Sequence, residues 1–391
     1  MYSFLLLLIY VTFVGLGLPD SLLGAAWPVM GPQMGVPLPF AGIVTMTIIG
    51  TTVFAALLSN KLTARYGTGL VTAVGISLTA AALFGFSSSQ SFWVLCVWAV
   101  PFGFGAGSID AALNSYVSLR YTSRHVNWLH CFWGVGAATS PHIMGYHLAN
   151  GMNWGGGYRT VAIVHFVLAA VLFACLFAWK SQTDQKAPEQ PDGGAPGLRD
   201  VLRVKGVKYA LLAFFAYCAL EQTTGLWASS FLVLQRGVRP EVAARFASFF
   251  FVGITAGRFL FGFIANALGN RLTIRTGIGI ALAGILILAL PGTPDWLCVS
   301  GLMVIGLGCA PIFPSAMHAT SANFGKRYAH ALIGMQMASA YVGAALMPPV
   351  FGLAADNVSM GLYPVFLFIF AILTLAMTEM LNKTVLFGDS R

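Results

Sequence analysis

Four ionisable side chains lie inside long apolar segments of the sequence: Asp20, Asp110, Glu221 and Arg258. On insertion scales such a group costs roughly 2.5–3.5 kcal/mol at the centre of a membrane-spanning helix, so its presence marks a functional site. Burial disfavours the carboxylate anion, and one arginine cannot neutralise three acids. Some of the acids are therefore expected to be protonated for part of the time, which is the chemistry of a proton carrier.

Asp110 lies in the segment GFGAGSIDAALNSYV. Its three glycines allow a neighbouring helix to approach closely. Asn114 follows one helical turn after Asp110, so the carboxyl and the amide share a face. We expect Asp110 to take part in proton coupling and Asn114 to contact a substrate, whereas the alternative is a packing face whose polar groups bond to each other.

A second polar cluster occurs in YCALEQTTGLWASSFL, which supplies Tyr217, Glu221, Gln222 and Trp227. A carboxylate, an amide and a phenol can bind sugar hydroxyls, while an indole can stack on the ring. The same residues could bind a cationic compound through the acid and through a cation–π contact. Trp227 is displaced by about a third of a turn from Glu221, and its alternative role is that of an interfacial aromatic.

Further candidates for substrate binding are Asp20, His130 in NWLHCFWGVG, and the pair Gln336 and Tyr341 in LIGMQMASAYVGAALMPPVFG. Arg258 is either a counter-ion to Glu221 or an anchor for helix packing. The histidines lack metal-ligand spacing, so we expect no metal and no cofactor. The sequence has no HExxH, G-x-S-x-G, Walker A or dinucleotide-binding motif in a fitting context. We expect a protein that is not an enzyme.

The amino-acid composition indicates whether these ionisable groups lie in a lipid or an aqueous environment. The chain has 391 residues, of which 58% are hydrophobic and 8% charged, against roughly 25% charged in soluble proteins. Its mean hydropathy is +0.80. The net charge of +9 does not indicate nucleic-acid binding, because the basic residues cluster in short loops between apolar runs. This pattern predicts an integral membrane protein surrounded by a lipid bilayer.

Hydropathy predicts an all-α membrane protein with twelve transmembrane helices in two pseudo-symmetric six-helix bundles. The spans are 3–30, 39–60, 69–88, 91–118, 128–149, 159–180, 208–233, 245–266, 273–291, 296–321, 331–354 and 361–381. Residues 1–180 would form the amino-terminal bundle, and residues 208–391 the carboxy-terminal bundle with a short cytoplasmic tail. The polar stretch 181–207, rich in Pro, Gly and charge, would be a cytoplasmic linker.

Basic residues set the orientation, because cytoplasmic loops carry an excess of Lys and Arg. With both termini cytoplasmic, 16 of the 21 basic residues fall inside. These are Lys61, Arg65, Arg120, Arg124, Lys180, Lys186, Arg199, Arg203, Lys205, Lys208, Arg271, Arg275, Lys326, Arg327, Lys383 and Arg391. We expect a multi-pass protein of the cell (inner) membrane.

The two halves resemble each other. VGAATSPHIMG (135–145) and VGAALMPPVFG (342–352) share the pattern V-G-A-A-x-x-P-x-x-x-G. Asp20-x-x-x-Gly24 is echoed by Glu221-x-x-x-Gly225, at nearly the same offset. A duplication of six helices, joined by a cytoplasmic linker, is an architecture of secondary transporters with a substrate site near the midplane.

With these features the whole chain resembles the major facilitator superfamily. The family's G-x-x-x-D-R-x-G-R-R motif appears as NKLTARYGTG, which keeps Arg65 and Gly67 but has alanine at the acid position. In the second half, GFIANALGNR keeps Gly269 and Arg271 but has asparagine there. The resemblance implies alternating access by rocking of two bundles, with Arg65 and Arg271 as gating residues.

Within this family, PDSLLGAAWP and GAGSIDAALNSYV resemble the fucose–proton symporter branch, which includes bacterial glucose/mannose symporters. The resemblance implies that Asp110 is the proton site and that Asp20 serves substrate binding, proton coupling or both. Asp110 stands where the branch usually has Glu. The implied function is proton-coupled symport of a sugar or a similar small polar solute.

An alternative is proton-coupled efflux of hydrophobic or cationic compounds, which Glu221 and the many aromatic residues favour. The exporter motif G-P-x-x-G-G is incomplete here, because SPHIMGY has Pro141 and Gly145 but not the other glycines. A transporter-like receptor is a third possibility, and the three buried acids argue against it. Sodium could replace the proton, because carboxylates bind both. We expect a monomer.

Overall fold

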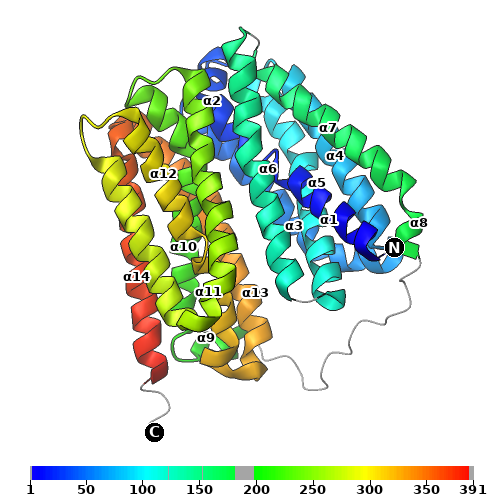
Figure 1. The fold of residues 1–391 in the computed structure, drawn as a ribbon, viewed down its shortest axis with the longest axis vertical. Coiled ribbons are helices and arrows are strands. Elements are labelled where there is room, and N and C mark those ends of the chain that lie inside the picture. Colours follow the sequence, from blue (N-terminus) through cyan, green and yellow to red (C-terminus); the bar gives the residue numbers. More distant parts are fainter. Residues whose placement is uncertain (1, 122, 152, 181–197, 387–391) are drawn as a thin grey trace.

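The computed structural model describes residues 2–121, 123–151, 153–180 and 198–386, and these parts are helical with short connections (Figure 1). The elements are α1 (Tyr2–Gly17), α2 (Leu22–Gln33), α3 (Phe40–Tyr66), α4 (Thr68–Ser88), α5 (Phe92–Arg120), α6 (Ser123–Ala149), α7 (Trp154–Ala174), α8 (Phe177–Lys180), α9 (Leu198–Arg203), α10 (Val207–Leu234), α11 (Pro240–Ala289), α12 (Asp295–Cys309), α13 (Ile312–Asn357), a 3₁₀ turn (Met360–Leu362) and α14 (Tyr363–Leu386).

The helices account for the twelve predicted spans. Ten segments of the described chain are long and apolar enough to cross a membrane. In these, α1 and α2 form one span, and α11 contains two, Pro240–Ala265 and Ala267–Ala289. Helices α6 and α10, of 27 and 28 residues, run beside them and complete the set of twelve. The predicted all-α membrane fold with two six-helix bundles is confirmed.

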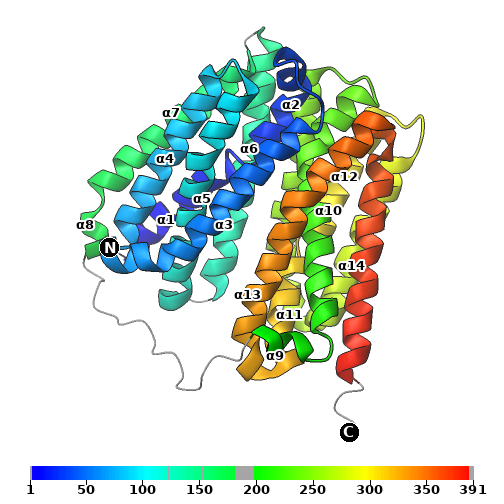
Figure 2. The same ribbon diagram turned by 180° about the vertical axis from the view of Figure 1, so that it is seen from behind.

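Helices α1–α8 form one bundle and α9–α14 the other (Figures 1 and 2). The bundles converge at the end where α2 lies and diverge toward the end that holds α9, the start of α1 and the end of α14. Most of the predicted linker, residues 181–197, lies outside the described residues. Its last part forms α9, in which Val201 is buried in a cluster with Phe324 and Leu332.

The first span is broken near its middle. Pro19 lacks an N–H group and therefore cannot continue the α-helical hydrogen-bond ladder. The chain turns tightly here, with Asp20 N–H donating to the Gly17 carbonyl at 3.3 Å and Leu22 N–H to the Pro19 carbonyl at 3.2 Å. The seventh span, α10, carries Glu221 at the equivalent place but is continuous. Asp20 and Glu221 thus occupy matching positions in the two halves, but the helix is broken at Asp20 and continuous at Glu221, because the second half has Leu220 where the first has Pro19.

Two glycines at equivalent places in the two halves explain which part of the degraded family motif this chain retains. Gly67 ends α3 with φ 82° and ψ 152°, and Gly269 divides α11 with φ 73° and ψ 156°. This backbone conformation is open essentially to glycine alone. The motif therefore keeps its glycines in both halves as turn residues, although its acidic position is lost.

We expect Gly269→Ala to destabilise the protein by about 1–3 kcal/mol, the usual cost of such a conformation for a residue with a side chain. The space around Gly269 is open, so the cost arises from the backbone and not from a clash. Thermal unfolding in detergent measures it. Gly279→Ala is the matched control, because Gly279 lies in the same helix, also faces open space, and has no positive φ. Equal melting temperatures for the two variants would contradict the prediction.

The repeated P-x-x-x-G motif packs one half against the other. A Cβ on Gly145 in α6 would meet the Glu241 carbonyl of α11 at 2.7 Å. A Cβ on the matching Gly352 in α13 would meet Pro39, just before α3, at 2.9 Å. Both contacts lie at the converging end of the bundles. The motif therefore serves helix packing at two equivalent interfaces.

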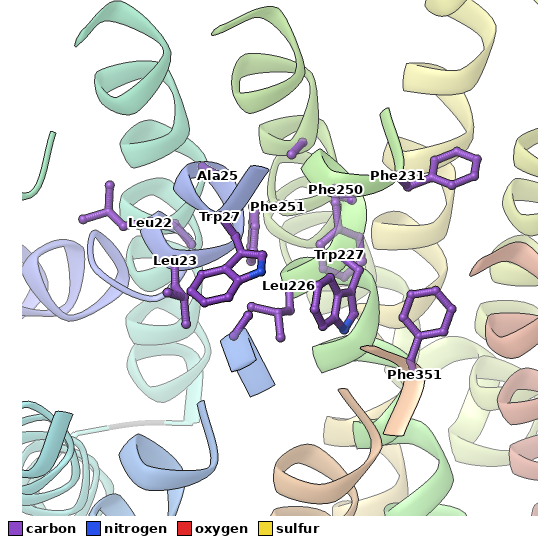
Figure 3. Close-up of a cluster of buried hydrophobic side chains, with 14 of the residues drawn as sticks. Leu22, Leu23, Ala25, Trp27, Leu226, Trp227, Phe231, Phe250, Phe251 and Phe351 are labelled. Atoms are coloured by element: carbon purple, nitrogen blue, oxygen red, sulfur yellow. The ribbon is translucent and has the colours of Figure 1, made fainter. Parts of the chain in front are cut away.

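A third close approach joins α2 and α10. A Cβ on Gly24 would lie 2.8 Å from the carbonyl oxygens of both Gly225 and Leu226. Gly24 and Gly225 are the repeat-related glycines, so the two halves touch at equivalent residues. Figure 3 shows Leu226 between the indoles of Trp27 and Trp227 beside this crossing. Buried apolar side chains thus fill the contact between the two halves on the converging side of the ionisable residues.

Candidate functional site

Asp20 lies at the break between α1 and α2, where its side chain is exposed although it is midway along the first span. Its Oδ2 accepts a hydrogen bond from Nε1 of Trp133 in α6 at 2.7 Å. The next residue, Ser21, is buried and donates to the Ala137 carbonyl of α6 at 2.7 Å. The helix break therefore presents the carboxylate while the adjacent hydroxyl ties the turn to α6.

Asp110 lies in the second half of α5, and its Oδ1 accepts a hydrogen bond from Asn114 Nδ2 at 2.8 Å. The preceding glycines allow helices to approach, as the sequence predicts. Gly107 packs against the α3 backbone at Thr52, and Gly105 against the α4 backbone at Gly75. Tight packing on two sides fixes the position of Asp110 relative to the rest of its bundle.

Glu221 and Arg258 meet between α10 and α11. Arg258 Nη2 lies 3.8 Å from Glu221 Oε1, and the side chains are 18% and 14% exposed, respectively. Arg258 Nη1 also donates to the His130 carbonyl of α6 at 3.2 Å. The Arg258 guanidinium lies 5.0 Å from the centre of the Trp133 ring. The structure therefore places Arg258 both against Glu221 and across the contact between the two halves.

These residues form one connected group across the molecule. Asp20 and Trp133 come from the first half, and Arg258 and Glu221 from the second. Asp110 lies within electrostatic range of Asp20 and of Tyr341 in α13. The arrangement can hold protons on carboxylates, bind hydroxyl groups and change its ion pairs when the halves move. Among the described residues, no three His, Cys, Asp or Glu side chains are grouped to hold a metal.

Three predicted substrate contacts are placed inside the packed second half instead. The indole of Trp227 is fully buried, donates to the Pro348 carbonyl at 2.9 Å and packs on Phe351. Tyr217 donates to the Cys309 carbonyl at 3.0 Å, and Gln336 accepts from Thr320 at 2.9 Å. The indole N–H of Trp227 and the Oε1 of Gln336 are thus bonded elsewhere in the protein. Tyr217, by contrast, also lies against Glu221 and so adjoins the ionisable group.

Other predicted residues lie at varied depths. Gln222 is exposed, whereas His130 is half-buried and packs edge-on against Phe13 at 6.1 Å. Arg65 is exposed at the end of α3, and its guanidinium lies 5.3 Å from the centre of the Tyr66 ring. Arg271 lies within electrostatic range of Glu379, an acid in α14. The two motif arginines are thus at the diverging end and outside the group around Asp20.

Trp133 is the residue of this group that sequence analysis missed. It stands three residues after His130 in a segment rich in aromatic residues, so its residue type does not distinguish it from its aromatic neighbours. One physical signal was available, because an indole N–H away from water needs an acceptor. Its acceptor, Asp20, is 113 residues distant, and only the packing of α1 and α2 against α6 reveals the pair.

A separate apolar groove of about 850 Å³ runs between α6 and α11. Its walls include Trp128, Phe132 and His142 on α6, with Thr255 and Phe259 on α11. The residues on α6 recur at helical spacing along one face, which differs from the face that carries His130 and Trp133. The groove therefore adjoins the ionisable group on another face of α6, and its wall residue Cys131 lies within electrostatic range of Arg258.

The comparisons identify relatives along the whole chain. The family model described as Major Facilitator Superfamily matches residues 9–329 and 211–387. The glucose/mannose transporter GlcP of Bacillus subtilis is 26% identical over an alignment of 289 positions, covering 71% of this chain and 70% of that protein. The hexuronate transporter of the same organism is 25% identical over an alignment of 266 positions, covering 63% of this chain and 60% of that protein.

Two further comparisons cover nearly the full length. Bypass of stop codon protein 6 of Saccharomyces cerevisiae is 22% identical over an alignment of 404 positions, covering 94% of this chain and 80% of that protein. The fold resembles that of a bacterial homologue of the human lysosomal transporter Spinster, solved in an inward-facing and unoccupied conformation. The TM-score is 0.73 at 14% identity, and 98% of each chain is covered.

Proposed function

The chain belongs to the Major Facilitator Superfamily of membrane transporters, and from this premise we propose that it imports a neutral sugar or a similar small polar solute together with protons. The observation that carries the proposal is the group formed by Asp20, Asp110, Glu221 and Arg258, which joins both halves at mid-membrane depth. In alternating access, rocking of the halves exposes such a group to each side of the membrane in turn.

Charge at the site favours a neutral substrate over an acidic one. The group contains three carboxyl groups and one arginine, and Arg258 already contacts Glu221, the Trp133 ring and the His130 carbonyl. A hexuronate would bring a further carboxylate to the site, and none of these groups is a second cation that could pair with it. A neutral hexose needs only hydroxyl partners, which Asp20, Asn114, Gln222 and Tyr341 can supply. Of the two kinds of sugar named for its relatives, we propose the neutral one.

Proton coupling follows from the same excess of acids. When a proton occupies Asp110 or Asp20, the repulsion between these neighbouring carboxylates falls, and substrate binding becomes compatible with a low-dielectric site. Release of the substrate and the proton on the other side then resets the carrier. The halves are packed together at the converging end and diverge toward the end with α9, which supports a state that opens toward that end. Under the positive-inside rule that end faces the cytoplasm, and the protein itself lies in the cell (inner) membrane.

Efflux of cationic compounds is the second candidate. The excess of negative charge at the site and the apolar groove between α6 and α11 favour it. The incomplete exporter motif in α6 does not, because its surviving glycine, Gly145, is explained by packing against α11. We therefore rank symport first.

One experiment separates these functions. The protein is reconstituted in liposomes that contain a pH-sensitive dye, and glucose, mannose, glucuronate and tetraphenylphosphonium are added in turn, with and without sodium. We expect glucose or mannose to cause inward proton flux, glucuronate to cause much less, and sodium to have no effect. Flux with the lipophilic cation alone, or none with any sugar, would overturn the proposal. Sugar uptake that depends on sodium without a pH change would reassign the coupling ion.

A further inference from the structure

Trp133 contacts charged groups of both halves. Its Nε1 donates to Asp20 Oδ2 at 2.7 Å, and its ring face lies 5.0 Å from the Arg258 guanidinium carbon. Its backbone is held firmly, because a Cβ on Gly17 of α1 would collide with the Trp133 carbonyl. The ring also meets Phe251 of α11 edge-on, with the ring centres 6.4 Å apart, so a change in the bond to Asp20 is carried by rotation of the side chain and not by movement of its backbone. We propose that Trp133 is a positioning residue that transmits the charge state of Asp20 to the Arg258–Glu221 pair.

The proposal rests on the proposed symport and adds the connection between its two halves. A carboxylate is a stronger acceptor than a neutral carboxyl group, so ionised Asp20 holds the Trp133 N–H in one direction. In that orientation the ring presents its electron-rich face to Arg258. Protonation of Asp20, or a substrate hydroxyl that replaces the N–H donor, releases the indole. Arg258 then loses one of its three contacts.

The loose geometry of the ion pair makes it responsive to this change. The 3.8 Å separation of Arg258 and Glu221 is longer than that of a direct charged hydrogen bond. The Trp133 ring and the His130 carbonyl hold Arg258 from the opposite bundle. Loss of the ring contact shifts Arg258 toward Glu221 and weakens the link between α6 and α11. Allosteric couplings typically amount to about 5- to 150-fold in affinity, and we expect the lower part of that range.

Several other charged groups face this unit from the surrounding helices. Asp110 of α5 lies within electrostatic range of Asp20, and its carboxylate is held by Asn114. Arg258 and Glu221 come from α11 and α10, and His130 precedes Trp133 on α6. The titration of Asp20 therefore also responds to Asp110. For this reason the test compares variants at Asp20 and at Trp133 and does not rely on one pH profile.

Trp133→Phe separates the two contacts, because it keeps an aromatic face for Arg258 and removes the N–H donor. The full-length protein is labelled with ¹⁵N at its nine tryptophans, and the indole signals are followed against pH. We expect one signal to titrate, to vanish in Trp133→Phe, and to stop titrating in Asp20→Asn. In Glu221→Gln its midpoint should move. Trp128→Phe is the matched control on the same helix, since Trp128 packs on Tyr10 and His125 instead.

A Trp133 signal that does not titrate, or that titrates equally in Asp20→Asn, would overturn the proposal. This readout needs no substrate, so it succeeds or fails separately from the symport. Transport supplies the second test. We expect Trp133→Phe to lower the number of protons moved per sugar in the wild-type background and to have no additional effect in Asp20→Asn. Additive effects would show that Trp133 acts only in packing.

Discussion

Asp110→Asn protein is expected to lose proton-driven accumulation of sugar while it continues to exchange internal for external sugar. An amide cannot carry a proton, but its oxygen can still accept the hydrogen bond that Asn114 donates to Asp110 at 2.8 Å. The packing of α5 through Gly105 and Gly107 is also unchanged. The substitution therefore removes the titration and preserves the surroundings of the site.

The size of the effect follows from the gradient. If one proton accompanies each sugar, one pH unit supports about tenfold accumulation, because 1.4 kcal/mol corresponds to a factor of ten. In Asp110→Asn the ratio of internal to external sugar should fall to about one. Uptake of radiolabelled sugar into liposomes with an imposed pH gradient measures it, and counterflow measures exchange.

Asp295→Asn is the matched control, because Asp295 is an exposed acid in the first turn of α12. It should accumulate sugar like the unmodified protein. Asp20→Asn assigns the carrier. If Asp110→Asn still accumulates sugar tenfold and Asp20→Asn does not, the proton travels on Asp20, and the assignment to Asp110 is wrong.

Gly24→Leu should open the converging end of the bundles and reduce transport strongly. A Cβ at this position already lies 2.8 Å from two carbonyl oxygens of α10, so α2 and α10 must separate to admit a side chain. Overpacking commonly costs about 1–3 kcal/mol. At the upper end of this range, the population of the described state would fall by about two orders of magnitude relative to a state in which these helices are apart.

Spin labels on Asn150 and Gln235 report this change, since both residues are exposed, one in each half, just beyond the ends of α6 and α10. In a background with the native cysteines replaced, electron–electron distance measurements should give a longer separation in Gly24→Leu. Gly50→Leu is the control, because Gly50 in α3 faces open space. Unchanged distances together with full transport in Gly24→Leu would contradict the prediction.

The two repeat-related glycines should also differ from each other. The atoms nearest to a Cβ on Gly225 would be side-chain atoms of Phe250 and Phe251, at 3.2 Å or more, whereas a Cβ on Gly24 meets backbone. Aromatic rings can shift by a few tenths of an ångström, but carbonyl groups in a helix cannot do so without moving the helix. We expect Gly24→Ala to impair transport more than Gly225→Ala, measured in the same uptake assay.

Sequence alone determined the membrane-spanning class, the duplication and the positions of the four ionisable groups. These inferences succeed because hydropathy is summed over about 20 neighbouring residues, and because a charge in an apolar run is costly wherever its partner lies. The degraded family motif was informative through its glycines, since the backbone at Gly67 and Gly269 has a conformation that requires glycine in any environment.

Tertiary structure alone decided which groups meet and which are merely packed. Trp227 and Trp133 are the same residue type in similar apolar segments, yet one is sealed against Pro348 and the other touches Asp20 and Arg258. The partners of Trp133 and Arg258 lie 113 and 128 residues away along the chain. Contacts over such separations depend on how two bundles of helices pack together, and no local pattern of residues records that.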